Sequence, residues 1–357
     1  MKLNKQIINK YYLLRTKYGF LRHFIKDIIL YKTPEHRKNN IYIFGIPTHT
    51  NVGDQAIAIA TRAFINEKLS NKRIIEIPDY AVIKVAKYLR KFDNLEKLNI
   101  IFHGGGNMGD TWPQADIYKH EVYKMLPNAT FIQFPQSTSF KPEGYNLPLV
   151  VEDLKHADST VIARETLSFN FMKNNFVNAN ILFSPDIVLS LNVKNTHFKR
   201  KYVTTFLRND IEKKNNDLIS QLNVYLVKNI ENLKESDTVV SSFEGKVTEQ
   251  NREKLFLNKL QEFHESKLIV TDRLHGMIFA CITGTPAIVF DNSNHKIKFT
   301  YHDWLKDVPY IYFVEESVSL NDLEGKVCQF LGDENEYNIP NFNREYQAVV
   351  NLLKGVS

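Results

Sequence analysis

The feature that most constrains the fold is an apolar strand, helix and strand in direct succession at residues 267–290. The run Lys267–Thr271 has the length and composition of a buried strand. A second such run follows a short apolar helix and a Gly-Thr-Pro break. Continuous apolar runs of strand length that alternate with helices are typical of parallel α/β units. We therefore predict a parallel sheet that contains this unit, with earlier strands at 201–207 and 237–241.

The same alternation of strands and helices begins near residue 41 and is interrupted by a polar, basic stretch at 193–200. Two consecutive series of this kind, separated by a linker, indicate two domains. We predict an α/β fold with two doubly wound, Rossmann-like domains that face a cleft. The expected division is a basic amphipathic arm at 1–40, domains at 41–192 and 200–335, and a C-terminal helix at 340–357.

Composition and cysteine content indicate an ordinary globular protein. Of the 357 residues, 43% are hydrophobic and 24% are charged, which is not a disordered composition. No apolar run reaches the ~18 residues of a membrane span, and the first residues show no signal-peptide pattern. The two cysteines, Cys281 and Cys328, cannot form a disulfide framework. We therefore expect a cytoplasmic protein.

The positive charge of the chain is concentrated at its beginning. Residues 1–38 contain ten Lys and Arg residues and two acidic residues, a net charge of +8, so the rest of the chain carries −2 of the total +6. A strongly basic body would suggest a nucleic-acid partner. Because the excess belongs to one short arm, we predict no nucleic-acid partner.

The arm has an apolar stripe at helical spacing. The stripe consists of Ile7, Tyr11, Leu14, Tyr18, Leu21, Ile25 and Ile28. A basic amphipathic helix of this kind can lie on an anionic membrane surface, which would make residues 1–33 a peripheral anchor on the inner face of the cell membrane. It can equally dock on the protein's own body or on a second subunit, so a homo-oligomer is left open.

Residues that can carry chemistry follow the strand at 267–271. Asp272, Arg273 and His275 lie in the turn after it, and ligands of open α/β sheets bind outside the carboxyl ends of the strands. Asp272 is most simply a helix cap. The Arg-x-His pair favours a ligand.

Two other strand-to-helix turns could also bind a ligand. Gly104, Gly105, Gly106 and Asn107 follow a predicted strand and precede a helix. There the backbone could approach an anion at a helix amino end, although glycine-rich turns also serve tight packing. Neither the dinucleotide fingerprint nor the P-loop pattern is present. Asn51 and Asp54 lie in an equivalent turn, where they either cap the helix or orient a substrate hydroxyl.

Arg164 and Arg208 each end a predicted strand, one in each series. Arginine can bind a carboxylate or a phosphate through two parallel hydrogen bonds. No His or Cys pair has metal-ligand spacing, and the Gly-x-Ser-x-Gly motif of Ser-triad hydrolases is absent. The inventory suits an anionic small molecule and a hydroxylated partner, with no metal.

Taken together, six motifs resemble, in order, those of the polysaccharide pyruvyl transferase family. They are N-V-G-D, H-G-G-G-N, A-R-E-T-L-S, S-P-D-I-V-L, T-D-R-L-H-G and G-T-P-A-I-V-F. The match runs from about Ile41 to Leu305. It implies a GT-B-like fold and transfer of pyruvate from phosphoenolpyruvate to sugar hydroxyls, which gives a cyclic ketal and releases phosphate. Phosphoenolpyruvate is then the donor substrate, and no cofactor is implied.

The resemblance also implies roles for individual residues. His275 would be the general acid, and Arg273, Arg164 and Arg208 would hold the donor's phosphate and carboxylate. Asp54, with Asn51 beside it, would orient or deprotonate the acceptor hydroxyl. The acceptor would be a sugar in a cell-wall, capsule or exopolysaccharide chain or in its lipid-linked precursor. Alternatives are a GT-B glycosyltransferase that uses a nucleotide sugar and a non-catalytic glycan-binding subunit.

Overall fold

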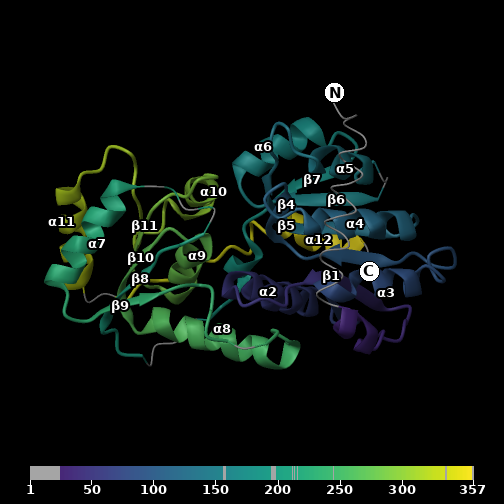
Figure 1. Cartoon of the computed structure of the whole chain (residues 1–357), viewed down its shortest axis with the longest axis horizontal. Coiled ribbons are helices and arrows are strands. Elements are labelled where there is room, and N and C mark those ends of the chain that lie inside the picture. Colours follow the sequence, from purple (N-terminus) through teal and green to yellow (C-terminus); the bar gives the residue numbers. More distant parts are fainter. Residues whose placement is uncertain are drawn as a thin grey trace. The chain divides into compact units, whose positions relative to one another are not determined.

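The structure is a computed structural model that describes residues 25–155, 158–193, 198–210, 212, 214, 216–243, 245–333 and 336–355. Its chain divides into two compact α/β units, which can be followed in Figure 1. Unit 1 contains the residues up to Thr48, Ile57–Ile187 and those from Glu345 onward, and unit 2 contains His49–Ala56 and Val188–Arg344. No helix in the described ranges has the length and apolar character to cross a membrane.

Unit 1 is built on a seven-stranded parallel sheet in the order β2-β1-β3-β5-β6-β7, with β4 paired to β5. The strands are β1 (Asn40–Ile46), β2 (Arg73–Pro78), β3 (Asn99–Phe102), β4 (Gly105–Gly109), β5 (Thr130–Ser139), β6 (Ser159–Ala163) and β7 (Asn180–Phe183). Every residue of β1 is buried, which explains its continuous apolar sequence, since both faces of a parallel sheet are covered.

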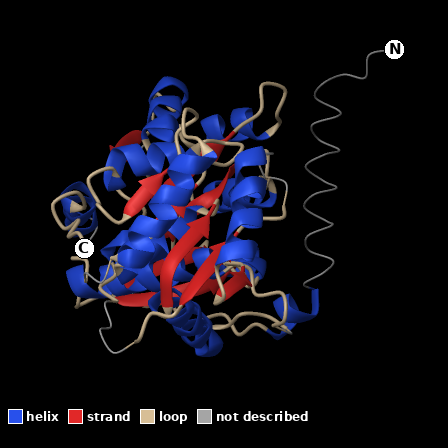
Figure 2. Ribbon diagram, turned by 90° about the vertical axis from the view of Figure 1, so that its left-hand side faces the viewer, coloured by secondary structure: helices blue, strands red, loops and turns tan. Residues whose placement is uncertain are grey.

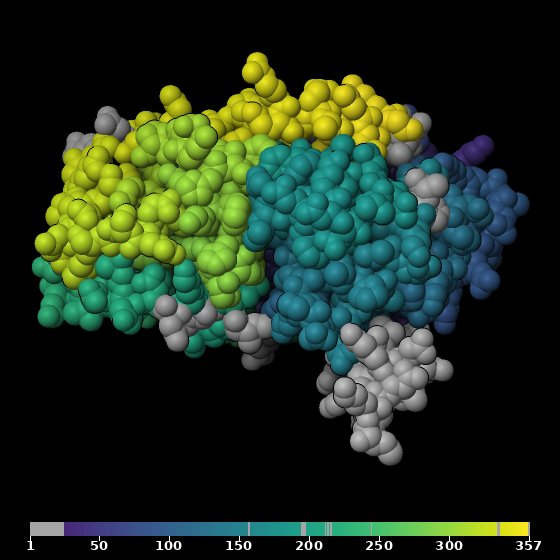
Figure 3. Space-filling model, turned by 90° about the horizontal axis from the view of Figure 1, so that it is seen from above, coloured from purple at the N-terminus to yellow at the C-terminus, as the bar shows by residue number. Residues whose placement is uncertain are grey.

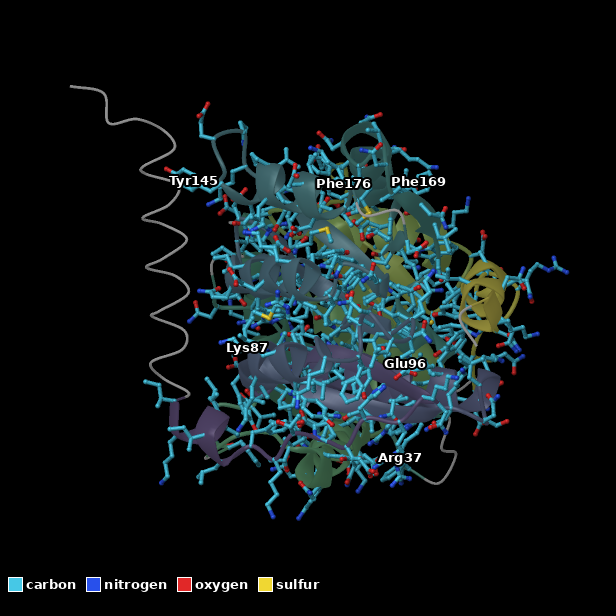
Figure 4. The ribbon with its side chains drawn as sticks, turned by 90° about the vertical axis from the view of Figure 1, so that its right-hand side faces the viewer. Arg37, Lys87, Glu96, Tyr145, Phe169 and Phe176 are labelled. Carbon is cyan, nitrogen blue, oxygen red and sulfur yellow. The ribbon has the colours of Figure 1, made fainter. Side chains whose placement is uncertain are left out.

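Helices cover this sheet and complete its core. They are α2 (Val52–Lys68), α3 (Val82–Leu89), α4 (Gln114–Met125), α5 (Asn146–Asp153), α6 (Thr166–Asn175) and α12 (Gln347–Gly355), with α2 beginning in unit 2. Phe169 of α6 and Phe176, which directly follows the helix, pack in this layer (Figure 4). The C-terminal residues, yellow in Figure 3, lie on the surface of unit 1. Tyr346 ties them down, since its hydroxyl donates to the carbonyl of Asp186 (2.5 Å).

Unit 2 is built on a five-stranded parallel sheet in the order β12-β11-β10-β8-β9. Its strands are β8 (Tyr202–Phe206), β9 (Leu233–Ser236), β10 (Ser266–Thr271), β11 (Ala287–Val289) and β12 (Ile311–Phe313). Its helices are α7 (Asp217–Asn229), α8 (Glu249–His264), α9 (Leu274–Thr283), α10 (Lys296–Thr300), which runs into a π-helical turn (Tyr301–Leu305), and α11 (Leu320–Gly332). Helices lie on both sides of the strands (Figure 2). The prediction of two doubly wound, Rossmann-like domains is confirmed.

The apolar unit at 267–290 forms β10, α9 and β11, as expected. Every residue of α9 except His275 is buried, because the helix packs between the sheet and α8, with Phe279 against Phe256 and Phe263. Gly284 ends the helix in the left-handed conformation, at φ 62°, which glycine adopts without steric cost. The core therefore buries every residue of α9 except His275, which is partly exposed.

The strand expected at 237–241 is wrong. β9 ends at Ser236, and the chain then leaves the sheet and pairs with residues 50–52 in antiparallel fashion. The amide of Val52 donates to the carbonyl of Thr238 (2.8 Å), and the amide of Val240 donates to that of Thr50 (3.1 Å). The β-branched residues at 238–240 favour an extended chain, as predicted. This extended segment forms a short antiparallel bridge with the loop at 50–52 and not a strand of the main sheet.

The glycine run at 104–106 is also not the expected strand-to-helix turn. Residues 105–109 form β4, and α4 begins later, at Gln114. Gly104 serves close packing instead, since a Cβ at this residue would lie 2.6 Å from the carbonyl oxygen of Pro135. A helix amino end next to this run is therefore not available to hold an anion.

The end of the arm packs on unit 1, whereas residues 1–24 lie outside the described residues. Residues 25–30 are helical, and Lys84 Nζ donates to the carbonyls of Ile28 and Tyr31 (both 2.8 Å). Farther along, His36 Nδ1 is 2.7 Å from the hydroxyl of Tyr42, and its Nε2 contacts Glu96. Figure 4 shows the side of the unit that carries Glu96. The choice between membrane and docking stays a prediction for residues 1–24.

Candidate active site

The candidate site lies at the carboxyl ends of β8 and β10, which are neighbours in the sheet of unit 2. From β8 the chain proceeds outward to β9 and then returns to the other side of β8 as β10, so this is the point where the strand order reverses. Such a topological switch point is where ligands bind in open α/β sheets. Arg208 follows β8 and Arg273 follows β10, so the sheet brings these two predicted residues together.

Asp272 joins the two strand ends and does not cap α9. Its Oδ1 accepts a hydrogen bond from the backbone amide of Arg208 (2.7 Å), and its carboxylate is buried. The cap position is occupied by Arg273, without a side-chain cap bond. Burial raises the pKa of Asp272, against the effects of the Arg208 amide and the nearby guanidinium groups. The expectation of a capping role was wrong because the acceptor serves the neighbouring strand.

Thr271 and Gly276 set the distance between α9 and the end of β10. The Thr271 hydroxyl donates to the carbonyl of Phe206 (2.8 Å) and accepts from the amide of Arg273 (3.0 Å). A Cβ at Gly276 would overlap this hydroxyl. The small residue after His275 therefore allows the first turn of α9, with His275 in it, to lie directly on the strand end.

Two carboxylates hold the guanidinium of Arg273. Its Nη1 donates to Asp210 Oδ2 (2.5 Å) and its Nη2 to Asp237 Oδ2 (2.6 Å). Burial alone would lower the pKa of Arg273, but these bonds outweigh it and raise the pKa. The side chain is 8% exposed. Arg273 is thus a permanently charged side chain with a fixed orientation, located just after the carboxyl end of β10.

Arg208 belongs to the same network. It pairs with Asp210 through Nε and Nη2 (2.9 and 3.2 Å) and with Glu212 through Nη2 (2.7 Å). Burial tends to raise the pKa of Asp210, yet the bonds and charges of Arg208 and the charge of Arg273 lower it to about 2. Lys296 Nζ adds a third cation, 2.7 Å from Glu212. The site is therefore a compact array of alternating charges.

The loop that carries Asn51 and Asp54 belongs to this unit as well. Asn51 Oδ1 accepts from the amide of Gly53 (3.1 Å), and its Nδ2 donates to Asp54 Oδ2 (2.9 Å). Asn51 is therefore the cap of α2, one of the two roles weighed for it, and it also orients Asp54. The carboxylate of Asp54 is 27% exposed and lies 3.7 Å from His49 Nε2.

The loop and α9 meet at Gly53 and His275. A Cβ on Gly53 would overlap the imidazole of His275 at Nδ1, so the glycine backbone lies directly against the ring. The imidazole also approaches the ring of Phe279, with 5.9 Å between centroids. His275 is thus held between the loop and its own helix, and the Asp54 that follows Gly53 is brought into the same neighbourhood. The structure places Arg208, Arg273, His275, Asn51 and Asp54 in one unit.

Arg164 has a different environment. It lies in unit 1, is 1% exposed, and donates from Nη1 to Asp186 (2.7 Å) and from Nε to Ser137 (2.7 Å). A guanidinium with this burial and these partners is part of the packing of unit 1. Gly104, Gly105, Gly106 and Asn107 also belong to unit 1. Their predicted contacts with substrate stay predictions.

Sequence reasoning missed the acidic members of the network. Asp210, Glu212 and Asp237 orient both arginines, and Lys296 balances Glu212. The available signal was the spacing after Arg208, since carboxylates two and four residues beyond an arginine in a loop can reach back to it. The contact of Asp237 with Arg273 was missed because Asp237 was predicted to begin a strand.

Comparisons with known proteins agree with this picture. A model of the family "Polysaccharide pyruvyl transferase" matches residues 51–294, which include every residue of the network except Lys296. The chain belongs to the polysaccharide pyruvyl transferase family. It is a pyruvyltransferase, and the family implies a polysaccharide as the acceptor of pyruvate.

Individual relatives extend the match beyond the family model. The chain is 34% identical to "General stress protein 30" of Bacillus subtilis over 88% of its own length and 92% of that protein. It is 25% identical to "Pyruvyl transferase 1" of Schizosaccharomyces pombe over 74% and 69%, respectively. A crystal structure of an uncharacterised Klebsiella pneumoniae protein shares the fold, with a TM-score of 0.52 and 18% identity over 84% of this chain and 98% of that one.

The buried Arg164–Asp186 pair predicts a large effect on stability. Arg164→Met should lower the free energy of unfolding by about 3–5 kcal/mol, because it leaves the Asp186 carboxylate buried without its cation. Urea denaturation provides the measurement. Arg37→Met is the control, since the Arg37–Glu35 pair is exposed and its loss should leave the free energy of unfolding almost unchanged. Equal losses in the two variants would contradict a structural role for Arg164.

The contact between Gly53 and His275 predicts a specific loss of activity. Gly53→Ala should displace the imidazole and lower pyruvyl transfer by about 10²-fold, the order that a misplacement near 1 Å costs. Unfolding measurements should show a well-folded protein, since alanine favours the helix in which residue 53 lies. Gly325→Ala in α11, where a Cβ meets no atom within 4 Å, is the matched control. An active Gly53→Ala variant would show that the position of His275 is not critical.

Proposed function

We propose that this protein transfers pyruvate from phosphoenolpyruvate to hydroxyls of a sugar in a cell-surface polysaccharide or its lipid-linked precursor. The product is a pyruvate ketal, and phosphate is released. The observation that carries the proposal is the joint placement of Arg208 and Arg273 at the switch point of unit 2, beside His275.

The chemistry of the donor matches this set of residues. Phosphoenolpyruvate carries a phosphate and a carboxylate, and arginine is the side chain best suited to bind each through paired hydrogen bonds. Arg208 and Arg273 share one partner, Asp210, so their guanidinium groups are close enough to hold two anionic groups of one small molecule. The proposed donor site consists of these two arginines.

The reaction needs a proton donor and a proton acceptor. In the proposed sequence, His275 gives a proton to the methylene carbon of phosphoenolpyruvate, which makes the central carbon electrophilic. A sugar hydroxyl adds to that carbon and loses its proton to Asp54. A second hydroxyl then displaces the phosphate, which leaves with the second hydroxyl's proton, and the ketal closes. His275 is the partly exposed residue of an otherwise buried helix, and Asp54 is partly exposed in the adjoining loop.

The proposal does not depend on the predicted residues of unit 1. Arg164 is engaged with Asp186 and Ser137, and the glycine run forms part of β4. The donor chemistry is assigned to unit 2 alone. Asn51 is given a positioning role, since it holds Asp54 and the start of α2.

The arm supports a lipid-linked acceptor. Its described end leaves Ile25, Ile29 and Leu30 exposed by 52%, 70% and 67%, and residues 1–38 carry a charge of +8. Apolar side chains next to basic ones suit an anionic membrane surface. Such attachment would bring the enzyme to an acceptor that is held in the membrane.

The role of His275 can be tested directly. His275→Ala should lower turnover by about 10²–10⁴-fold, the usual contribution of a general acid. The assay follows phosphate release and product mass with phosphoenolpyruvate and the host's lipid-linked glycan pool. His302→Ala is the control, because His302 is a half-exposed histidine that pairs with Glu315 in the same unit. A folded His275→Ala variant with near-normal turnover would refute the mechanism. Thermal stabilisation by a nucleotide sugar but not by phosphoenolpyruvate would refute the proposed donor.

Membrane attachment can be tested by removing residues 1–24. This deletion keeps the contacts of Lys84 with Ile28 and Tyr31, so unit 1 should remain folded. Co-sedimentation with vesicles that contain phosphatidylserine should fall to the level seen with purely zwitterionic vesicles, because the charge and most of the stripe are lost. Unchanged binding, or aggregation of the shortened protein, would favour docking of the arm on protein.

A further inference from the structure

We infer that Asp210 is an internal counter-ion that occupies the anion position between Arg208 and Arg273 and is displaced when the donor binds. This inference rests on the proposed function, because it concerns how the same two arginines receive phosphoenolpyruvate. It assigns to Asp210 a role in setting the affinity and the anion selectivity of the donor site.

The geometry of Asp210 resembles that of a bound carboxylate ligand. Both of its oxygens face Arg208, with Oδ1 at 2.9 Å from Nε and Oδ2 at 3.2 Å from Nη2. The same Oδ2 also accepts from Arg273 Nη1 at 2.5 Å. Paired contacts of this kind are the way in which arginine binds substrate carboxylates and phosphates. Asp210 therefore uses the donor groups that an incoming anion needs.

Asp210 is the most exposed of the carboxylates that pair with the two arginines, at 36% against 31% for Asp237 and 9% for Glu212. Glu212 is 9% exposed, and its carboxylate is fixed by Lys296 while its carbonyl accepts from the amide and the hydroxyl of Ser293. Asp237 accepts from the amide of Val239 through Oδ1 (3.3 Å), in the segment that pairs with the loop at 50–52. Asp210 also accepts a hydrogen bond from the backbone amide of Glu212 (3.1 Å), within its own loop.

Charge balance favours displacement of Asp210. The network contains the cations Arg208, Arg273 and Lys296 and the carboxylates Asp210, Glu212, Asp237 and Asp272, which is three positive charges against four negative ones. A doubly or triply charged donor would be repelled by this total. Asp210 cannot be neutralised instead, since Arg208 and Arg273 hold its pKa at about 2. It must therefore move away from the arginines for the donor to bind.

This arrangement favours a ligand with two anionic groups. Such a ligand replaces Asp210 on both arginines, whereas inorganic phosphate offers a single group against the same competitor. Removing the counter-ion should raise the affinity for both anions and reduce the preference for phosphoenolpyruvate.

The experiment measures binding of phosphoenolpyruvate and of inorganic phosphate to the full chain by isothermal titration calorimetry. We expect Asp210→Asn to lower the Kd for phosphoenolpyruvate about fivefold or more, the factor that corresponds to ~1 kcal/mol for a partly exposed ion pair. The Kd for phosphate should fall by a larger factor. Asp210→Ala provides a second variant, and the thermal midpoint of each protein establishes that it is folded.

Two controls separate this role from a general effect of charge. Glu152→Gln removes a carboxylate from an exposed pair with Lys155 in unit 1 and should leave both Kd values unchanged. Asp237→Asn removes a carboxylate beside the same Arg273 and should not tighten binding, because that group fixes the position of the arginine.

The outcomes distinguish the inference from the proposed function. If the natural protein binds phosphoenolpyruvate and both Asp210 variants bind it equally well or more weakly, the inference is wrong and the proposed function stands. Equal tightening by Asp210→Asn and Asp237→Asn would also overturn the inference, since the effect would then be one of charge alone. If neither the natural protein nor any variant binds phosphoenolpyruvate, the proposed donor is wrong, and the inference fails with it.

Discussion

The hydrogen bond from the backbone amide of Arg208 to the carboxylate of Asp272 is the interaction on which the site depends. It joins the ends of β8 and β10, from which the two segments of the chain would otherwise diverge toward separate helices. Because the acceptor is a buried carboxylate, the bond is charge-assisted and stronger than a bond between neutral groups. It brings both arginines to one point of the sheet edge. Without it, the network around Asp210 would lack a fixed frame.

The segment at 237–240 extends this frame to the loop at 49–54. Asp237 holds Arg273 through its side chain, and the residues that follow pair with the loop through their backbone. The loop in turn places Gly53 against His275 and orients Asp54 through Asn51. Arg273, His275 and Asp54 are thus connected through one backbone bridge and the side chains at its two ends. Backbone contacts suit this purpose, because they do not depend on flexible side chains and tolerate a change of substrate charge.

Sequence patterns predicted the two α/β domains and the strand ends at which the candidate site residues lie, since both follow from regular periodicity. Continuous apolar runs identified β10 and β11, and strands of a parallel sheet end on one edge, so the proximity of Arg208 and Arg273 could be anticipated. Asp210 was missed because it lies in a loop without periodicity, where its spacing from Arg208 was the one signal. The segment at 237–240 was misassigned because β-branched residues favour an extended chain whether or not it joins the main sheet. The loop at 49–54 follows β1 in sequence, and only tertiary contacts assign it to unit 2.

Arg164 and Arg208 show where such patterns stop being informative. Both follow an apolar strand and both precede acidic residues, Glu165 after Arg164 and Asp210 and Glu212 after Arg208. Arg164 is buried by Asp186, a residue 22 positions away, together with Ser137. Arg208 instead meets acids from its own loop, of which Asp210 is partly exposed. The proposed role of Arg208 requires that one of its counter-ions can leave, and this depends on the packing around each carboxylate. The difference between Arg164, which is buried with its partners, and Arg208, whose partner Asp210 is partly exposed, therefore had to come from the three-dimensional structure.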